Sequence, residues 1–229
     1  MKQSILDNQN HESDITARLI TWSKFHGGLI LDIGASLGFF AKNILEYYPN
    51  SKVVCIEPSV INFEHLVNNT SGKNVLPIMG AVTNGDKKVI FYENYNPNQG
   101  SIFMSNYLKC WNNTIEKNYE VVGYDFKNLI NTLQPNLIKI DIEGYEFFLD
   151  YTNLPESVNT IIFEIHMSDV NIEGKPISNI IDNDLEVYTK ILETLKFQGF
   201  KFISAEGFSI HWDGKWDGSN NTHMACLTR

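Results

Sequence analysis

Short apolar runs alternate with stretches of helical periodicity along the first third of the chain. Each run is almost continuously apolar, which is typical of strands that are buried on both faces of a parallel sheet. The three runs lie at residues 29–32, 52–57 and 75–79. Between them, residues 39–48 and 60–68 carry apolar positions at helical spacing, and Pro49 ends the first stretch. This order predicts a β-α-β-α-β unit with helices on both faces and right-handed crossovers.

The rest of the chain continues the alternation less regularly. Apolar runs predict three further strands, at residues 137–141, 160–165 and 200–204. A periodic stretch predicts a helix over residues 185–197, and residues 222–227 can return as an antiparallel last strand. Weaker patterns indicate two short strands and a short helix, at residues 89–92, 119–122 and 125–133. The expected fold class is α/β, with a doubly wound, mostly parallel, Rossmann-like sheet.

The beginning and the middle of the chain give weaker signals. Ser13 or Asp14 can cap a helix that runs to about Phe25, and residues 1–12 are expected to be frayed. Residues 93–118 are rich in Asn and form an expected insertion. Large aromatics there and in the tail could form a sugar-stacking wall or a satellite core: Tyr95, Phe103, Tyr107, Trp111, Trp212 and Trp216. Neither a repeat nor a linker interrupts the chain, so we expect one domain over residues 1–229.

Composition narrows the classes of partner. A formal charge of −9 without any Lys/Arg cluster argues against nucleic acid. No apolar run reaches the roughly 18 residues of a membrane span, and the polar N-terminus lacks the basic-then-apolar layout of a secretory signal. Three scattered cysteines show neither a disulfide framework nor metal-ligand spacing, and Cys55 reads as a small buried apolar residue. We therefore expect a cytoplasmic protein, and the sequence does not indicate its oligomeric state.

A glycine turn follows the first predicted strand and opens into a helix. Residues 29–38 read Leu-Ile-Leu-Asp-Ile-Gly-Ala-Ser-Leu-Gly, so Asp32 ends the strand and Gly34 and Gly38 frame the turn. In an open α/β sheet such a turn handles a nucleotide, because glycine lets the backbone approach the ligand closely. Glu57 ends the second strand 23 positions after Gly34. It can accept hydrogen bonds from a ribose diol or stabilise the start of the next helix.

Ser36 narrows the type of nucleotide. A dinucleotide fold usually carries a second glycine that makes room for the pyrophosphate, and Ser36 stands at that position. A ligand without a pyrophosphate does not need the gap. S-adenosyl-L-methionine is such a ligand, and its sulfonium cation suits a pocket lined by carboxylates. We therefore expect S-adenosyl-L-methionine as the cofactor and count Ser36 among the residues that bind it.

Four blocks of the sequence resemble the FkbM-type methyltransferases, which use S-adenosylmethionine and have the class I methyltransferase fold. The blocks occur in the family's order and spacing, at residues 31–40, 54–58, 138–146 and 162–166. The most specific is Lys-Ile-Asp-Ile-Glu-Gly-Tyr-Glu at residues 139–146, which generic Rossmann-like proteins lack. The resemblance implies a seven-stranded sheet and O-methylation of a hydroxyl, commonly on a sugar or a polyketide-type product. Residues 93–118 and the tail after residue 205 match no block, and we expect them to select the substrate.

The resemblance also implies roles for individual residues. The methionine end of the cofactor would be lined by Asp32, Gly34, Ala35 and Gly38. Glu57 would hold the ribose, and Ala81 and Val82 would lie near the adenine. Asp141 would face the amino group or the point of methyl transfer.

An acceptor hydroxyl has to lose its proton, and three polar residues at strand ends are candidate catalytic bases. They are Asp141, Glu143 and His166. Asp141 and Glu143 share a strand phase and can point into one cleft, or Glu143 could orient the turn at Gly144. His166 could instead cap its strand or the next loop. With Asp169, the three candidates could hold a divalent ion, but no spacing demands one and no metal is expected.

Lys139 sits inside an apolar strand, where a lone ammonium group is costly. We expect it to have an architectural role and to form an ion pair with Glu164 on the neighbouring strand.

Two other functions fit parts of the pattern. A nicotinamide-dependent oxidoreductase would use a similar turn, but the Tyr-x-x-x-Lys match at residues 48–52 is interrupted by Pro49. A non-catalytic binding module on a methyltransferase fold is the second rival, and the presence of Asp32, Glu57 and Asp141 counts against it. The function expected from the sequence is therefore O-methylation of a small-molecule hydroxyl, with a sugar or glycan as the first candidate.

Overall fold

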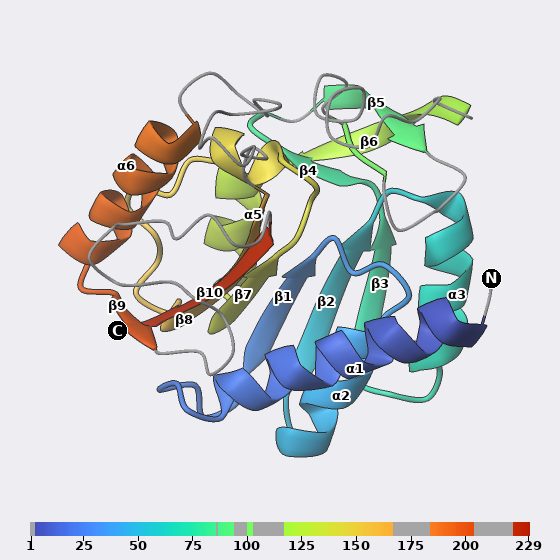
Figure 1. Ribbon diagram of the computed structural model, residues 1–229, viewed down its shortest axis with the longest axis horizontal. Coiled ribbons are helices and arrows are strands. Elements are labelled where there is room, and N and C mark those ends of the chain that lie inside the picture. Colours follow the sequence, from blue (N-terminus) through green and yellow to red (C-terminus); the bar gives the residue numbers. More distant parts are fainter. Residues whose placement is uncertain (1–2, 86, 94–99, 103–116, 167–183, 204–221) are drawn as a thin grey trace, which may run out of the picture.

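The computed structural model describes residues 3–85, 87–93, 100–102, 117–166, 184–203 and 222–229. Its centre is a seven-stranded sheet with the order β3-β2-β1-β7-β8-β10-β9 (Figure 1). These strands are β1 (Leu29–Ile33), β2 (Lys52–Glu57), β3 (Val75–Met79), β7 (Leu137–Ile140), β8 (Thr160–His166), β9 (Lys201–Ile203) and β10 (Thr222–Thr228). Strand β10 lies antiparallel between β8 and β9, and the other neighbours are parallel. The predicted doubly wound, mostly parallel sheet with an antiparallel last strand is confirmed.

Alternation along the strands sends side chains into two separate cores. One core lies under α1 (Gln3–Ile20), α2 (Phe39–Tyr47) and α3 (Val60–Thr70), and its strand residues include Ile30, Val53, Leu137 and Ile162. The other lies under α5 (Phe126–Leu133) and α6 (Asp184–Phe197), and its strand residues include Leu31, Val54, Ile138 and Ile161. Because both faces are covered, the strands read as continuous apolar runs in the sequence.

The strand order reverses beside β1. The chain runs from β1 outward to β2 and β3, and later crosses back to β7 on the other side of β1. Loops that leave β1 and β7 therefore diverge and open a crevice at the carboxyl ends of the strands, where ligands bind in open α/β sheets. Gly34 follows β1 and Asp141 follows β7. The topology thus brings together two candidate residues that are far apart in the sequence.

A second, smaller sheet lies beyond the carboxyl ends of β2 and β3 (Figure 1). It consists of β4 (Ala81–Thr83), β6 (Lys117–Asp125) and β5 (Lys87–Glu93), with β6 in the middle. The short strands expected at residues 89–92 and 119–122 are the centres of β5 and β6. Strand β4 and the sheet itself were not expected, since three residues carry no readable periodicity.

The N-terminal helix differs from the sequence expectation at both ends. Residues 1–12 were expected to be frayed, yet α1 already begins at Gln3 and packs on α2. The helix ends at Ile20, not near residue 25. Beyond it, the hydroxyl of Ser23 donates to Ile20 O at 2.6 Å, so a side chain caps the last turn before Gly27 is reached. Trp22, just after the end of the helix, is 53% exposed.

Several expectations fall outside the described residues. Most of the expected insertion at residues 93–118 does so, as do the aromatic residues Tyr95, Phe103, Tyr107, Trp111, Trp212 and Trp216. Within the described ranges, no helix is both long and apolar enough to cross a bilayer.

Candidate functional site

The glycine turn after β1 is held in place by the protein's own backbone. Gly34 N and Ala35 N both donate to Ile56 O of β2, at 3.0 and 3.1 Å. Gly38 N donates to Ala35 O at 2.9 Å. Gly34 has a φ of +76°, and a Cβ there would lie 1.7 Å from the backbone oxygen of Asp141. The close approach of the turn to the end of β7 therefore requires glycine before any ligand is considered.

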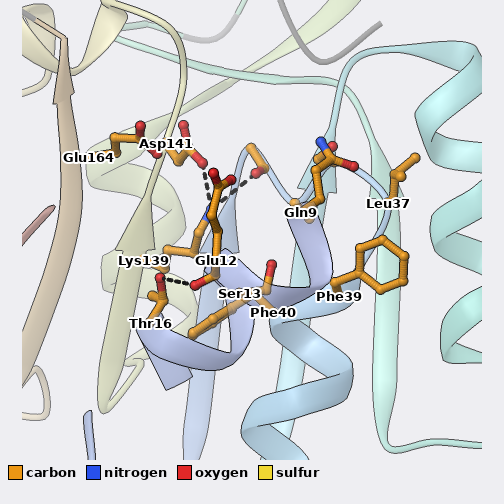
Figure 2. Close-up of a pocket in the computed structure, with 13 residues that line it drawn as sticks. Gln9, Glu12, Ser13, Thr16, Leu37, Phe39, Phe40, Lys139, Asp141 and Glu164 are labelled. Atoms are coloured by element: carbon orange, nitrogen blue, oxygen red, sulfur yellow. Dashed lines mark hydrogen bonds and ion pairs between the residues drawn. The ribbon is translucent and has the colours of Figure 1, made fainter. Parts of the chain in front are cut away.

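A pocket opens between this turn, the end of β7 and helix α1 (Figure 2). The turn and α2 contribute Gly34, Ala35, Ser36, Leu37, Phe39 and Phe40. The sheet contributes Lys139, Asp141 and Glu164, and α1 contributes Gln9, Glu12, Ser13 and Thr16. The cavity volume is about 90 Å³. Sites for whole small molecules span roughly 300–1,000 Å³, so this pocket can take only one end of such a ligand.

Helix α1 forms the wall of the pocket that sequence reasoning missed. Thr16 is buried, and its hydroxyl donates to Glu12 O at 3.0 Å. Asn43 Nδ2 of α2 donates to Asn10 O at 3.3 Å, so the two helices are tied together beside the turn. The polar character of residues 1–12 hid this helix. The available signal was the absence of any Gly or Pro before Gly27.

Lys139 reaches into this pocket from β7 and is surrounded by carboxylates. Its Nζ lies 3.5 Å from Asp32 Oδ1 and 3.2 Å from Asp141 Oδ2. The same ammonium donates to Gly34 O at 3.2 Å. Burial alone would lower the pKa of Lys139, but three neighbouring carboxylates raise it above its ordinary value: Asp141, Asp32 and Glu164. Asp32 is fully buried, and burial raises its pKa against the opposing charge of the ammonium.

The partner expected for Lys139 was Glu164, and the register explains the difference. Asp32 lies directly opposite Lys139 in the β1–β7 pairing. On the other side, the residue opposite Lys139 is Ile162, so Glu164 lies two positions farther along β8. Among the described residues, the ion pairs of Lys139 are therefore with Asp32 and Asp141, and Glu164 adds its charge from farther away.

Glu57 lies on the other side of the glycine turn, at the end of β2, and is 4% exposed. Its Oε2 accepts a hydrogen bond from Ser36 N at 2.8 Å, and its Oε1 accepts one from Ser59 N at 2.9 Å. Burial raises the pKa of Glu57 to about 7, although these backbone groups and the Asn62 side chain favour the ionised form. A carboxylate has about four acceptor sites, so beside these three donors Glu57 can accept a further hydrogen bond.

Ser36 connects the two sides of the turn. Its backbone N–H donates a hydrogen bond to Glu57, and Ser36 itself lines the pocket together with Lys139 and Asp141. Ser36 adopts a φ of +47°, in the left-handed region that non-glycine residues rarely occupy. Its hydroxyl oxygen is buried, and no hydrogen-bond partner for it exists among the described residues. A buried hydroxyl without a partner is costly, so this group is available to a ligand.

The three candidate bases lie in different settings. Asp141 lines the pocket. Strand β7 ends at Ile140, so strand alternation does not extend to Glu143, which lies in the following turn with a φ of +53°. Glu143 is not among the described residues that line the pocket. His166 is the last residue of β8, and its side chain lies outside what the structure describes. The catalytic roles of these residues stay predictions.

The remaining candidates are placed as follows. Gly38 is the N-cap of α2, with a φ of +79°. Ala81 and Val82 lie in β4, and both are buried in hydrophobic clusters, so a position near the adenine stays a prediction. Among the described side chains, no group of three or more His, Cys, Asp or Glu could hold a metal ion. Asp169, from the alternative divalent-ion set, lies outside the described residues.

Comparisons with known proteins add a distant likeness of fold. No protein-family model matches the chain, and no curated protein matches it either. Among solved structures, the chain is similar to the plantazolicin methyltransferase BpumL in complex with SAH. The two share 15% identity with a TM-score of 0.47, over 100% of this chain and 90% of that chain.

Two other solved structures show a similar degree of likeness. A SAM-dependent methyltransferase from Leishmania major shares 14% identity with a TM-score of 0.45, over 95% of this chain and 72% of that chain. Fibrillarin from Aeropyrum pernix, with natively bound S-adenosyl-L-methionine, shares 13% identity with a TM-score of 0.44, over 94% and 76% of the two chains. At these values no residue role carries over to this chain.

Proposed function

We propose that the protein binds S-adenosyl-L-methionine and transfers its methyl group to a hydroxyl of a small molecule. The observation that carries the proposal is how the backbone N–H groups of the glycine turn are used. Gly34 N and Ala35 N donate to Ile56 O, and Ser36 N donates to Glu57. Phosphate sites at such turns depend on free N–H groups that point at the anion. A turn whose amides are already bonded offers little to a pyrophosphate.

The charge of the pocket supports a cationic ligand. Asp141 and Glu164 line it, and Glu12 adds a third carboxylate from α1 (Figure 2). Lys139 balances part of this charge, and its ammonium is already paired with two of the nearby acids. The amino group and the sulfonium of S-adenosylmethionine both carry positive charge, so they fit an acid-lined pocket of this size. Glu57, beyond the turn, then suits the ribose diol.

The chain's own residues would hold the reactants and handle one proton. When bound, S-adenosylmethionine supplies a methyl group on a good leaving group. The pocket residues have to fix its amino-acid end, and the site has to align the acceptor oxygen with the methyl group. Asp141 bonds Lys139 through Oδ2, which leaves Oδ1 to accept a proton or a hydrogen bond. The candidate bases for the acceptor hydroxyl remain Asp141, Glu143 and His166.

The resemblance to the FkbM-type methyltransferases supports a more specific proposal. Its most specific block, residues 139–146, contains two residues that line the pocket, Lys139 and Asp141. The family commonly methylates hydroxyls of sugars or polyketide-type products, so we propose a sugar or glycan hydroxyl as the acceptor. Methyl transfer to a panel of sugars, nucleotide sugars and simple alcohols tests this choice.

Calorimetric titration with S-adenosylhomocysteine, and separately with NAD(P)H, tests the cofactor. We expect the wild-type protein to bind S-adenosylhomocysteine and Glu57→Ala to bind it more weakly by about 1–3 kcal/mol, the cost of losing hydrogen bonds to a charged group. Glu64→Ala, which removes an exposed carboxylate from α3, is the matched control and should leave the affinity unchanged. Binding of NAD(P)H without S-adenosylhomocysteine would overturn the proposal. Tight binding without transfer to any acceptor would favour a binding module.

A further inference from the structure

A second buried carboxylate lies behind Glu57. Glu93 is the last residue of β5 in the small sheet, and it is 3% exposed. Its Oε1 accepts a hydrogen bond from the hydroxyl of Ser59. No sequence pattern singled out Glu93, and the proposed function does not use it. Two acids from different sheets are thus joined through one serine.

Ser59 transmits the position of one acid to the other. A serine hydroxyl has a single proton, which Ser59 uses in its hydrogen bond to Glu93, so Oγ accepts from Asn62 N at 3.2 Å with a lone pair. The backbone N–H of Ser59 points to Glu57 Oε1 at 2.9 Å. Ser59 is fully buried and is the N-cap of α3. Its rotamer and its backbone are therefore fixed by the same two carboxylates.

The small sheet supports the start of α3 at a second point. The hydroxyl of Tyr119, on β6, accepts a hydrogen bond from Val60 N at 3.1 Å. Burial raises the pKa of Tyr119 to about 12, so the phenol stays neutral. The Tyr119 ring packs against Phe91 of β5, with 5.8 Å between ring centroids. Glu93 and Tyr119 together hold the loop between β2 and α3 against the small sheet.

We propose that Glu93 is a positioning residue for the cofactor's ribose. Acting through Ser59, it holds the Glu57 carboxylate in the orientation in which it accepts from a vicinal diol. This inference rests on the proposed function, since it needs a ribose at Glu57. The small sheet would then have a role in cofactor binding, although it is distant in sequence from the glycine turn.

The test compares two ligands, S-adenosylhomocysteine and its 2′-deoxy analogue, by calorimetry. Glu93→Met removes the acceptor at similar side-chain length. We expect it to weaken the binding of S-adenosylhomocysteine about tenfold and that of the analogue less than about threefold. The analogue has already lost part of the diol contact. Glu93→Gln keeps an oxygen acceptor for Ser59 and should restore most of the affinity. Glu120→Met, which removes an exposed carboxylate from the same sheet, is the control and should leave the affinity for both ligands unchanged.

The possible results separate this inference from the proposed function. If the wild-type protein binds neither ligand, the proposed function fails. If it binds both and Glu93→Met weakens them equally, or not at all, Glu93 does not position Glu57 for the diol. Circular dichroism and thermal melting check that the variant folds. Should Glu93→Met not fold, Ser59→Ala breaks the same link from the other side and must show the same selective loss.

Discussion

The two sides of the glycine turn both bury carboxylates, but they compensate them differently. On one side, Asp32 and Asp141 share the ammonium of Lys139, at 3.5 and 3.2 Å. On the other side, Glu57 is held by the backbone N–H groups of Ser36 and Ser59. The described residues include no ion pair of Glu57 with a Lys or Arg. One side is compensated by a charged side chain, and the other by the backbone.

Because of this difference, we expect the two sides to control two different properties, the free energy of unfolding and its dependence on pH. Removing one side chain, Lys139, leaves the fully buried Asp32 without its counter-charge, so the folded state depends on that residue. No single substitution removes both backbone N–H groups that hold Glu57. Burial nevertheless brings the pKa of Glu57 to about 7, where its charge changes near neutral pH. We therefore expect mutations on the Lys139 side to act on folding, and pH to act on the Glu57 side.

Lys139→Met is expected to have the largest effect. It keeps the length of the side chain and removes the charge, so the free energy of unfolding should fall by about 3–5 kcal/mol, as when one partner of a buried pair is removed. Urea denaturation at pH 7 measures the loss. Lys88→Met is the control, because its pair with Glu120 is 72% and 52% exposed and should contribute less than about 1 kcal/mol. A similar small loss in both variants would mean that Asp32 is neutral, and the contrast between the two sides would disappear.

The titration of Glu57 should make the free energy of unfolding depend on pH. Its pKa is raised from 4.5 to about 7, so between these values the folded state keeps a proton that the unfolded chain has released. The free energy of unfolding should therefore fall as pH rises through this window, by up to about 3 kcal/mol from this residue. Glu57→Gln should remove that part of the slope in urea denaturation between pH 5 and pH 8. The exposed-site variant Glu64→Gln should keep the wild-type slope.

Binding of S-adenosylhomocysteine should respond to pH in the opposite sense. If Glu57 contacts the ribose, its ionised carboxylate accepts hydrogen bonds from the diol, whereas the protonated form has less acceptor capacity. Affinity should therefore rise as pH increases through about 7. An affinity that is flat from pH 6 to pH 8, together with a normal stability slope, would mean that Glu57 titrates without touching the ligand.

Sequence reasoning succeeded where one physical cause dominates the pattern. Strands β2 and β3 were both predicted to the residue. Strand β2 is buried on both faces and leaves a continuous apolar run, and the edge strand β3 keeps an apolar run although Leu76 and Met79 are exposed. The glycine turn was found for a related reason, since only glycine tolerates the approach of Asp141 to Gly34. Gly34 was expected to serve a ligand, whereas the neighbouring strand end already requires a glycine there.

Contacts between residues that are far apart in the sequence could not be predicted from the sequence alone. The choice between Asp32 and Glu164 as the partner of Lys139 depends on register, which an apolar strand pattern does not specify. The hydrogen bond from Ser59, at the start of α3, to Glu93 of the small sheet spans 34 positions, and the three-residue strand β4 left no periodic signal. Helix α1 is polar and is ordered by packing on α2, so its own residues did not reveal it as a wall of the pocket.

Ser36 lies between the two sides, and its substitution should have the smallest effect on folding. Ser36→Gly relieves the strain of a φ of +47°, but it also adds freedom to the unfolded chain, so the unfolding free energy should change by less than about 1 kcal/mol. Ser36→Ala is the matched variant, because it keeps the strain and removes only the hydroxyl. If that hydroxyl serves the ligand, both variants should weaken S-adenosylhomocysteine to a similar extent, about three- to tenfold. If Ser36→Ala instead destabilises the free protein by more than about 2 kcal/mol, the hydroxyl is bonded within the fold. The turn would then bind the ligand only through the acids on its two sides.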